Sequence, residues 1–394
     1  MSFEIYHQLG FRDSWNLQSI HDDNTADGII ISPRHMDSIK VRELPAEIRE
    51  TAIFDPQFYI PSVPKKQLET YDFFPEIIAN GFDTAKYLGA IALDSARKCI
   101  DYQRKNGFRY IVIPTRQVPG VPPSFIDEQQ ELFVDPFLQA IDEFHADKPV
   151  LLQLILNDNM IKDVEYSARI LDWVTRLPRI NGVYLITEVI RRSKQLKDID
   201  FLYSLLKFIY SVTVLNKMEL VAGYLNVEAL LLSIASPTIV AMGSYENTRM
   251  FDVRNFEEGE DQVMRGPRPR VYSSKLLQLV DHNYLGSIQQ SVRGKGDVFD
   301  ANKYQAEMFS PNFNWHFQRP ELYKHYFLVL SRQLRELSQV EGADRFFLVK
   351  SWLERSKAQY AQLDTIVFDA DSDDSHINAW HTAANRFAKE QGWH

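Results

Sequence analysis

Cysteine is almost absent from the sequence, which has only Cys99 in 394 residues. A single cysteine cannot form an intramolecular disulfide bond, and it cannot supply a cysteine-rich zinc site. This usage is typical of a reducing compartment. Residues 1–15 lack the basic start and the apolar core of a secretory signal, and no apolar run approaches the length of a membrane span. We therefore predict a cytoplasmic protein without membrane contact.

The short motifs that identify many cofactor and metal sites are missing as well. There is no Walker or Rossmann glycine pattern, no G-x-S-x-G nucleophile elbow, no H-E-x-x-H and no His-x-His. The acidic run at 369–374 lacks the glycine and the final glutamate of a calcium loop, and Asp374 or Ser375 fits better as a helix cap. The sequence thus predicts neither a metal nor a cofactor.

Positive charge is in the minority, because 44 Lys and Arg residues stand against 53 Asp and Glu residues, for a formal net charge of -9. We therefore do not expect a polyanion to bind over the whole surface. One segment, RGPRPR at 265–270, is locally basic. Its Arg265, Arg268 and Arg270 are candidates for contact with nucleic acid, or for ion pairs with the acidic run 257–261 in the same loop.

Short apolar runs, each followed by polar residues and then by a helical pattern, recur along the chain. This alternation is the repeat of a parallel α/β fold, and eight such units over roughly 250 residues are the size of a (β/α)8 barrel. Residues 1–27 read as an irregular lead-in. The predicted strands are 28–31, 51–54, 109–113, 149–156, 182–186, 219–223, 238–242 and 270–274. The order of strands and strand-end polar residues from 28 to 293 resembles the TIM-barrel superfold.

The last quarter of the chain has a different character, with amphipathic patterns at 321–338, 343–363 and 375–391. We predict two units, a (β/α)8 barrel with its lead-in at 1–300 and a helical carboxyl-terminal unit at 301–394. The aromatic residues of the helical tail are expected to pack against the barrel wall or against another copy of the chain. A homo-oligomer or a protein partner is therefore a candidate assembly.

Active sites of such barrels lie at the carboxyl ends of the strands, so position alone selects candidate residues. Three acidic residues, Asp55, Glu188 and Glu246, follow different strands and are the candidate catalytic carboxylates. Two carboxylates around a substrate suit acid, base or nucleophilic chemistry, including cleavage of glycosidic bonds. The alternative interpretation is that such residues form turns or cap helices, the role we predict for Asn226 and Asn247.

Further strand-end residues are predicted to bind the substrate. Arg34, Arg116 and Lys275 would hold an anionic part, and backbone amides near Gly243 and Ser244 suit a phosphate. The full predicted set is Arg34, His35, Gln57, Arg116, Gln153, Asn157, Asn226, Gly243, Ser244 and Lys275. The sequence therefore favours a hydrolase or transferase acting on a polar, phosphorylated or nucleotide-like substrate. The rival hypothesis is a non-catalytic barrel that recognises nucleic acid or a protein partner.

Overall fold

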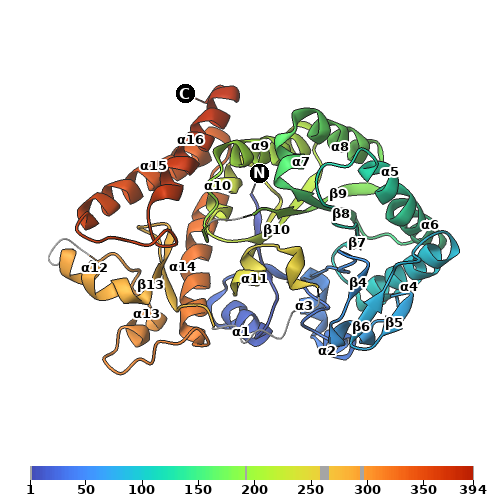
Figure 1. The fold of residues 1–394 in the computed structure, drawn as a ribbon, viewed down its shortest axis with the longest axis horizontal. Coiled ribbons are helices and arrows are strands. Elements are labelled where there is room, and N and C mark those ends of the chain that lie inside the picture. Colours follow the sequence, from blue (N-terminus) through green and yellow to red (C-terminus); the bar gives the residue numbers. More distant parts are fainter. Residues whose placement is uncertain (1, 191–192, 258–265, 293–296, 394) are drawn as a thin grey trace.

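The computed structural model describes residues 2–190, 193–257, 266–292 and 297–393. Its centre is an eight-stranded parallel sheet with the order β3-β2-β1-β11-β10-β9-β8-β7. The two ends of this sheet meet, since the Arg109 amide beside β7 donates to the Ala52 carbonyl beside β3 at 3.0 Å. The strands are β1 (Glu4–Gln8), β2 (Gly28–Ile31), β3 (Ile53–Phe54), β7 (Ile111–Ile113), β8 (Val150–Asn157), β9 (Ile180–Glu188), β10 (Glu219–Leu225) and β11 (Ile239–Gly243). The predicted (β/α)8 TIM-type barrel with a helical carboxyl-terminal extension is confirmed (Figure 1).

Helices follow the strands and surround the barrel (Figure 1). They are α1 (Asp13–Asp23), α2 (Ser38–Glu43), α3 (Ala46–Thr51), α4 (Ala90–Asn106), α5 (Phe125–Gln129), α6 (Asp135–Glu143), α7 (Asp158–Lys162), α8 (Val164–Arg176), α9 (Ile199–Tyr210), α10 (Ala229–Leu232) and α11 (Glu246–Arg249). A small antiparallel sheet of β4 (Ser62–Val63), β5 (Glu76–Ile78) and β6 (Gly81–Asp83) lies within the long segment between β3 and α4. None of the helices in the described ranges is both long enough and apolar enough to span a membrane.

Two of the strand predictions are wrong, although the count of eight is right. Residues 1–27 were predicted to be irregular, but they contain β1, whose Glu4 carboxylate accepts a bond of 2.7 Å from Arg109. The strand thus includes Glu4, which is paired with Arg109, and the fully buried His7 and Gln8, and such polar residues do not give the apolar pattern of a barrel strand. The segment 270–274 was predicted as the eighth barrel strand. Instead, β12 (Arg270–Ser273) pairs with β13 (Gln278–Asp281) in an antiparallel hairpin outside the barrel.

The carboxyl-terminal helices pack directly against the barrel, on the left of Figure 1. They are α12 (Leu285–Ser291), α13 (Lys303–Met308), α14 (Pro320–Ser338), α15 (Gly342–Tyr360) and α16 (Ser375–Glu390). Helix α14 contacts α1 and β1, and α16 contacts α9. Trp380 of α16 is buried and donates to the Leu196 carbonyl at 2.8 Å, as expected of an aromatic residue that packs within the chain. The division into two units at residue 300 stays a prediction.

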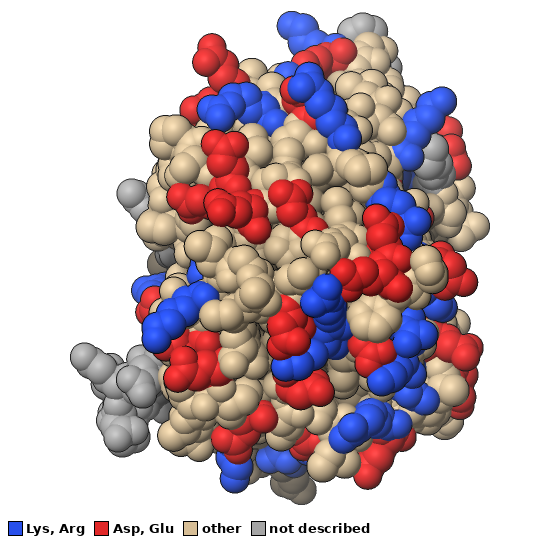
Figure 2. All heavy atoms as spheres, turned by 90° about the vertical axis from the view of Figure 1, so that its right-hand side faces the viewer, with Lys and Arg blue, Asp and Glu red and all other residues tan. Residues whose placement is uncertain are grey.

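On the opposite side of the molecule, the described residues of both charge signs are intermixed. Figure 2 shows Lys and Arg mixed with Asp and Glu over the face that includes α4 and α6. Arg97 of α4 pairs with Glu143 of α6 at 2.6 Å, and Lys98 pairs with Asp94 at 2.6 Å. This face therefore offers no electrostatic footprint for a polyanion.

A buried arginine ties α15 to the barrel. The Arg345 side chain is 0% exposed and donates to the carbonyls of Leu337, Val340 and Ser233 at distances of 2.9 to 3.0 Å. Its guanidinium also lies 5.0 Å from the ring of Phe3. Burial lowers the Arg345 pKa to about 10, which still leaves the group charged at neutral pH.

We expect Arg345→Met to lower the free energy of unfolding by about 2 kcal/mol, because three carbonyls, two of them on buried residues, lose this donor. Arg355→Met is the matched control, since Arg355 lies exposed on the same helix and, within the described part of the chain, its hydrogen bonds go to Ser351. Chemical denaturation would measure both variants. An equal effect in the two would contradict the role assigned to Arg345.

Candidate active site

A buried carboxyl lies at the carboxyl end of the barrel. Asp55 follows β3 and is 0% exposed. Its Oδ2 accepts hydrogen bonds from the hydroxyls of Tyr59 and Tyr184, the latter at 3.1 Å. Its Oδ1 accepts from the Gln153 side-chain amide at 2.8 Å and from the Gln57 backbone amide at 3.2 Å. Strand β8 thus contributes Gln153, which was predicted to bind substrate, and strand β9 contributes Tyr184, which was not predicted.

The environment of Asp55 favours its neutral form. Burial raises the pKa of the Asp55 carboxyl to about 6, although the hydrogen bonds from Tyr59, Gln153, Gln57 and Tyr184 lower it. Among the described residues, no Lys, Arg or His forms an ion pair with Asp55, so only neutral donors stabilise its charge. Burial and the nearby Asp55 charge raise the pKa values of Tyr59 and Tyr184 well above normal, which keeps both phenols protonated. A carboxyl that titrates near neutral pH can act as either acid or base.

Two residues of this network have left-handed backbone conformations that are uncommon for residues other than glycine. Gln57 has φ 58° and Tyr224 has φ 56°. The register of β10 shifts beside Tyr224, and its hydroxyl lies 3.3 Å from that of Tyr59. The residue before Tyr224 is Gly223. A side chain at this position would be too close to Tyr184, because a Cβ atom would lie 2.6 Å from the Tyr184 ring. Such strain is concentrated at functional sites in proteins.

A layer of aromatic rings covers Asp55. The rings of Phe251 and Phe256 lie edge-on against Tyr59, with centroid distances of 5.0 and 4.7 Å. Phe251 also contacts Tyr224 at 5.4 Å. The segment that follows β11 therefore packs on Tyr59, whose hydroxyl bonds to the fully buried Asp55.

A cleft of about 430 Å³ lies on the outer side of this aromatic layer. Phe251 is one of its walls, and Glu188, at the end of β9, is another. The remaining lining residues are Gln117, Pro119, Gly120, Asn157, Asp158, Asn159, Val189, Ile190, Met250, Asp252, Val253 and Arg254. The cleft is lined by both polar and apolar residues and lies at the carboxyl ends of the strands, where barrel enzymes bind substrate.

Comparisons with known proteins identify no family. No protein-family model and no curated protein matches the chain. Dihydrodipicolinate synthase from Oceanobacillus iheyensis aligns over 90% of this chain and 96% of its own, with 9% identity and a TM-score of 0.34. The same enzyme from Bacillus clausii aligns over 60% of this chain and 67% of its own, with 13% identity and a TM-score of 0.33. The barrel assignment rests on the strand order described above.

Several predicted substrate-binding residues lie close to this site. Gln153 and Gln57 bond to Asp55, and Asn157 lines the cleft while capping α7 through the Met160 amide at 3.1 Å. The Arg34 guanidinium lies 4.8 Å from the Phe256 ring, and burial lowers its pKa. Beside it, burial lowers the pKa of His35 to about 3, so His35 is neutral.

Arg116 is directed away from the cleft. Its guanidinium donates to the Thr84 hydroxyl at 2.6 Å and lies 5.6 Å from the Phe133 ring. Its backbone amide donates to Gln129 at 2.8 Å. Arg116 is thus occupied in joining β7 to the segments that flank α4 and α5.

Glu246, the third predicted carboxylate, lies apart from Asp55 on the short helix α11. It forms an ion pair with Lys194 and is half-exposed. Ser244 lines a small cavity of about 30 Å³ with Glu246, and its buried hydroxyl bonds to none of the residues that the structure describes. Gly243 contacts Thr248 so closely that a Cβ would lie 2.2 Å from the Thr248 backbone. The Asn226 side chain was predicted to cap a helix. Instead, its oxygen accepts a hydrogen bond from the Tyr326 hydroxyl at 3.4 Å.

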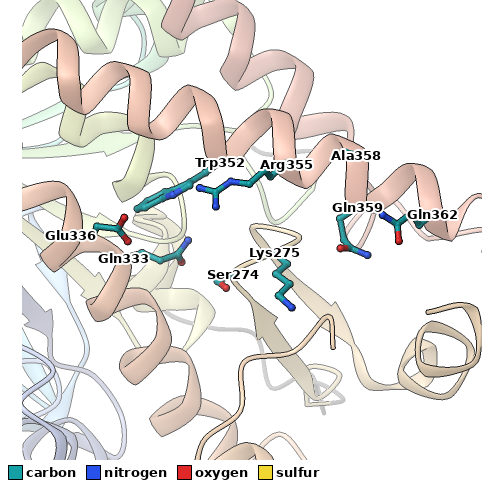
Figure 3. Close-up of a pocket in the computed structure, with 9 residues that line it drawn as sticks. All are labelled: Ser274, Lys275, Gln333, Glu336, Trp352, Arg355, Ala358, Gln359 and Gln362. Carbon is teal, nitrogen blue, oxygen red and sulfur yellow. The ribbon is translucent and has the colours of Figure 1, made fainter. Parts of the chain in front are cut away.

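Lys275 lies outside the barrel mouth, contrary to its predicted position at the end of an eighth strand. It belongs to the turn of the β12–β13 hairpin and bonds to the Asp297 carbonyl. Together with residues of α14 and α15, such as Trp352 and Arg355, it lines a separate groove of about 470 Å³ (Figure 3). The error follows from assigning 270–274 to the barrel.

The basic segment is largely neutralised where the structure describes it. Arg270 is 7% exposed and pairs with Asp371 at 3.5 Å, while Arg268 pairs with Asp281 at 3.3 Å. Arg265 and most of the acidic run 257–261 lie outside the described residues. The acidic partners of Arg268 and Arg270 thus come from β13 and the segment before α16. Contact of these arginines with nucleic acid stays a prediction.

The tyrosines around Asp55 were missed by sequence reasoning. Tyr184 and Tyr224 lie within apolar strand runs, where a tyrosine usually serves as core. The one signal in the sequence was the alternation of side chains along a strand. Tyr184 lies four residues before Glu188 and therefore on the same face of β9 as this predicted site residue. Tyr59 lies in a loop, and no periodic pattern marks it.

Proposed function

We propose that this protein is a barrel enzyme in which Asp55 acts as an acid, a base or a nucleophile on a polar substrate. The single observation that supports this most is a fully buried carboxyl group, with a pKa of about 6, at the carboxyl end of a barrel strand. Strongly perturbed carboxyls in such positions are typical of catalytic groups. The reaction class that fits first is cleavage or transfer at a glycosidic or similar carbon–heteroatom bond.

The tyrosine hydroxyls suit this chemistry. Tyr59 and Tyr184 both donate to Asp55 Oδ2 and stabilise the carboxylate whenever Asp55 has lost its proton. When Asp55 takes up a proton, the hydroxyls can turn toward Tyr224 and Gln8, which lie 3.3 and 3.4 Å away. The network therefore accommodates both states of the carboxyl without moving the backbone.

The substrate class is proposed from the amide groups that line the cleft and from Arg34. Gln117, Asn157 and Asn159 present amide groups to the cleft, which suit a hydroxyl-rich or amide-bearing group. Arg34 has no carboxylate partner among the described residues and lies on Phe256, at the edge of the aromatic layer. A guanidinium in this position favours a phosphorylated or nucleotide-like substrate.

The proposal can be tested by a thermal-shift screen of nucleosides, nucleotides and sugar phosphates, followed by mass spectrometry of the products. We expect at least one of these compounds to raise the melting temperature, because it binds only the folded state. The same compound should be converted by the wild type and not by Asp55→Asn. Conversion by both proteins at equal rates would exclude Asp55 as the catalytic group.

A further inference from the structure

Glu188 connects β9 to the segment that covers Asp55. Its Oε1 accepts a hydrogen bond from the Val253 backbone amide at 3.2 Å, and its backbone forms a parallel bridge with Phe251. Its Oε2 accepts from the Gln117 side chain at 2.7 Å. Both carboxylate oxygens are therefore engaged in holding other parts of the chain.

The segment at 250–256, which we call the strap, carries the two rings of the aromatic layer. Phe251 and Phe256 are 1% and 3% exposed, and both contact Tyr59. Phe251 faces the cleft on its other side. The strap is thus the partition between the cleft and Asp55.

The base of this partition is tied to Glu188 as well. Gln117, which donates its side-chain amide to Glu188, also donates its backbone amide to the Tyr59 carbonyl at 2.9 Å. The Tyr59 hydroxyl in turn bonds to Asp55. Glu188 is therefore linked to the strap above Tyr59 and to the backbone of Tyr59 itself.

We propose that Glu188 is a positioning residue that holds the strap closed over Asp55, and that the strap must move away before a ligand in the cleft reaches Asp55. Glu188 lies in the cleft wall, so an entering ligand meets its carboxylate before it meets Asp55. A ligand that donates a hydrogen bond to Glu188 competes with the Val253 amide and thereby favours opening. This inference rests on the proposed function, because it concerns access to the proposed catalytic group.

The first test is hydrogen–deuterium exchange with mass spectrometry on Glu188→Ala. We expect the amides of the strap to exchange roughly tenfold faster than in the wild type, which corresponds to one lost hydrogen bond to a charged acceptor. Glu188→Gln should exchange more slowly than Glu188→Ala, since its side-chain oxygen can still accept from Val253. Asp158→Ala is the matched control, because Asp158 is a carboxylate of the same cleft that pairs with Lys162 instead. Unchanged exchange in Glu188→Ala would overturn the proposal.

A second measurement reports on Asp55 itself. In Glu188→Ala and in Phe251→Ala, solvent should reach the site more often, so the Asp55 pKa should fall from about 6 toward its ordinary value. Carbon-13 NMR of labelled aspartate side chains would measure this, with Asp55→Asn to assign the resonance. An Asp55 pKa that stays near 6 in both variants would exclude the strap as the barrier.

The two proposals fail separately. If strap exchange rises in Glu188→Ala but Asp55→Asn still turns over substrate, the positioning role of Glu188 stands and the catalytic role of Asp55 falls. If Asp55→Asn is inactive and strap exchange is unaffected by Glu188→Ala, the reverse holds.

Discussion

Replacing Asp55 by asparagine is expected to lower turnover by about 10² to 10⁴ while making the protein more stable at pH 8. The amide can retain all four contacts of the carboxyl. Its oxygen accepts from Gln153 and the Gln57 amide, as Oδ1 does, and its NH₂ group donates to Tyr59 and Tyr184. The change therefore removes a titratable group and leaves the packing intact.

The sign of the stability effect follows from the raised pKa of Asp55. The folded protein binds this proton up to pH 6, whereas an ordinary Asp releases it near pH 3.8. The stability that the protonated carboxyl contributes is fully present below pH 3.8 and is lost as the pH rises through 6. At pH 8 the charged Asp55 lowers the free energy of unfolding of the wild type by about 3 kcal/mol. Asp55→Asn carries no charge here and should therefore be more stable than the wild type by about this amount.

Asp281→Asn is a suitable control for this prediction. Asp281 is also buried, but the Asn283 amide and the nearby Arg268 and Arg270 lower its pKa. Its replacement should destabilise the protein at pH 8, with the opposite sign. Urea denaturation at pH 5 and pH 8 would measure both variants. A loss of stability at pH 8 in Asp55→Asn would identify Asp55 as a structural carboxylate and would contradict its proposed catalytic role.

The barrel could be predicted from the sequence because its buried strands are continuous apolar runs, as in 149–156. The exact set of strands could not be predicted. The strand β1 contains His7 and Gln8, which are buried although they are polar, while β12 contains the apolar pair Val271 and Tyr272 without belonging to the barrel. The predicted number of strands was still eight, because β1 was missed and 270–274 was wrongly included.

The candidate site was predictable where position alone determines it. Asp55 directly follows an apolar strand and precedes Pro56, so its place at the barrel mouth could be predicted from the sequence. The tyrosines were not predictable, because their role depends on which strand faces are inside the barrel. Position alone also selected two residues that lie elsewhere. Glu246 forms an ion pair with Lys194, and Lys275 lies in the hairpin outside the barrel.

Acid should destabilise this protein through its buried histidines. Burial lowers the pKa of His7 to about 3 and that of His376 to about 4. His7 is stacked on Phe327 with a centroid distance of 4.0 Å, and His376 lies against Trp380 and bonds to the Leu277 carbonyl at 3.0 Å. The unfolded chain takes up protons on both residues below pH 6.5, and the folded chain does not. Each histidine therefore costs about 2 kcal/mol of stability between pH 7 and pH 5.

Asp55 opposes this loss over the same range, because it gains a proton in the folded state and returns about 1 kcal/mol. The effect of the two histidines is larger, so the free energy of unfolding should fall by about 3 kcal/mol between pH 7 and pH 5. Urea denaturation at pH 7 and pH 5 should show this loss shrinking by about 2 kcal/mol in His7→Asn and again in His376→Asn. His145→Asn is the control, since His145 is exposed and has φ 47°, which asparagine tolerates. If the three variants keep the slope of the wild type, the imidazoles at 7 and 376 are not held neutral by burial, and acid must act on other groups.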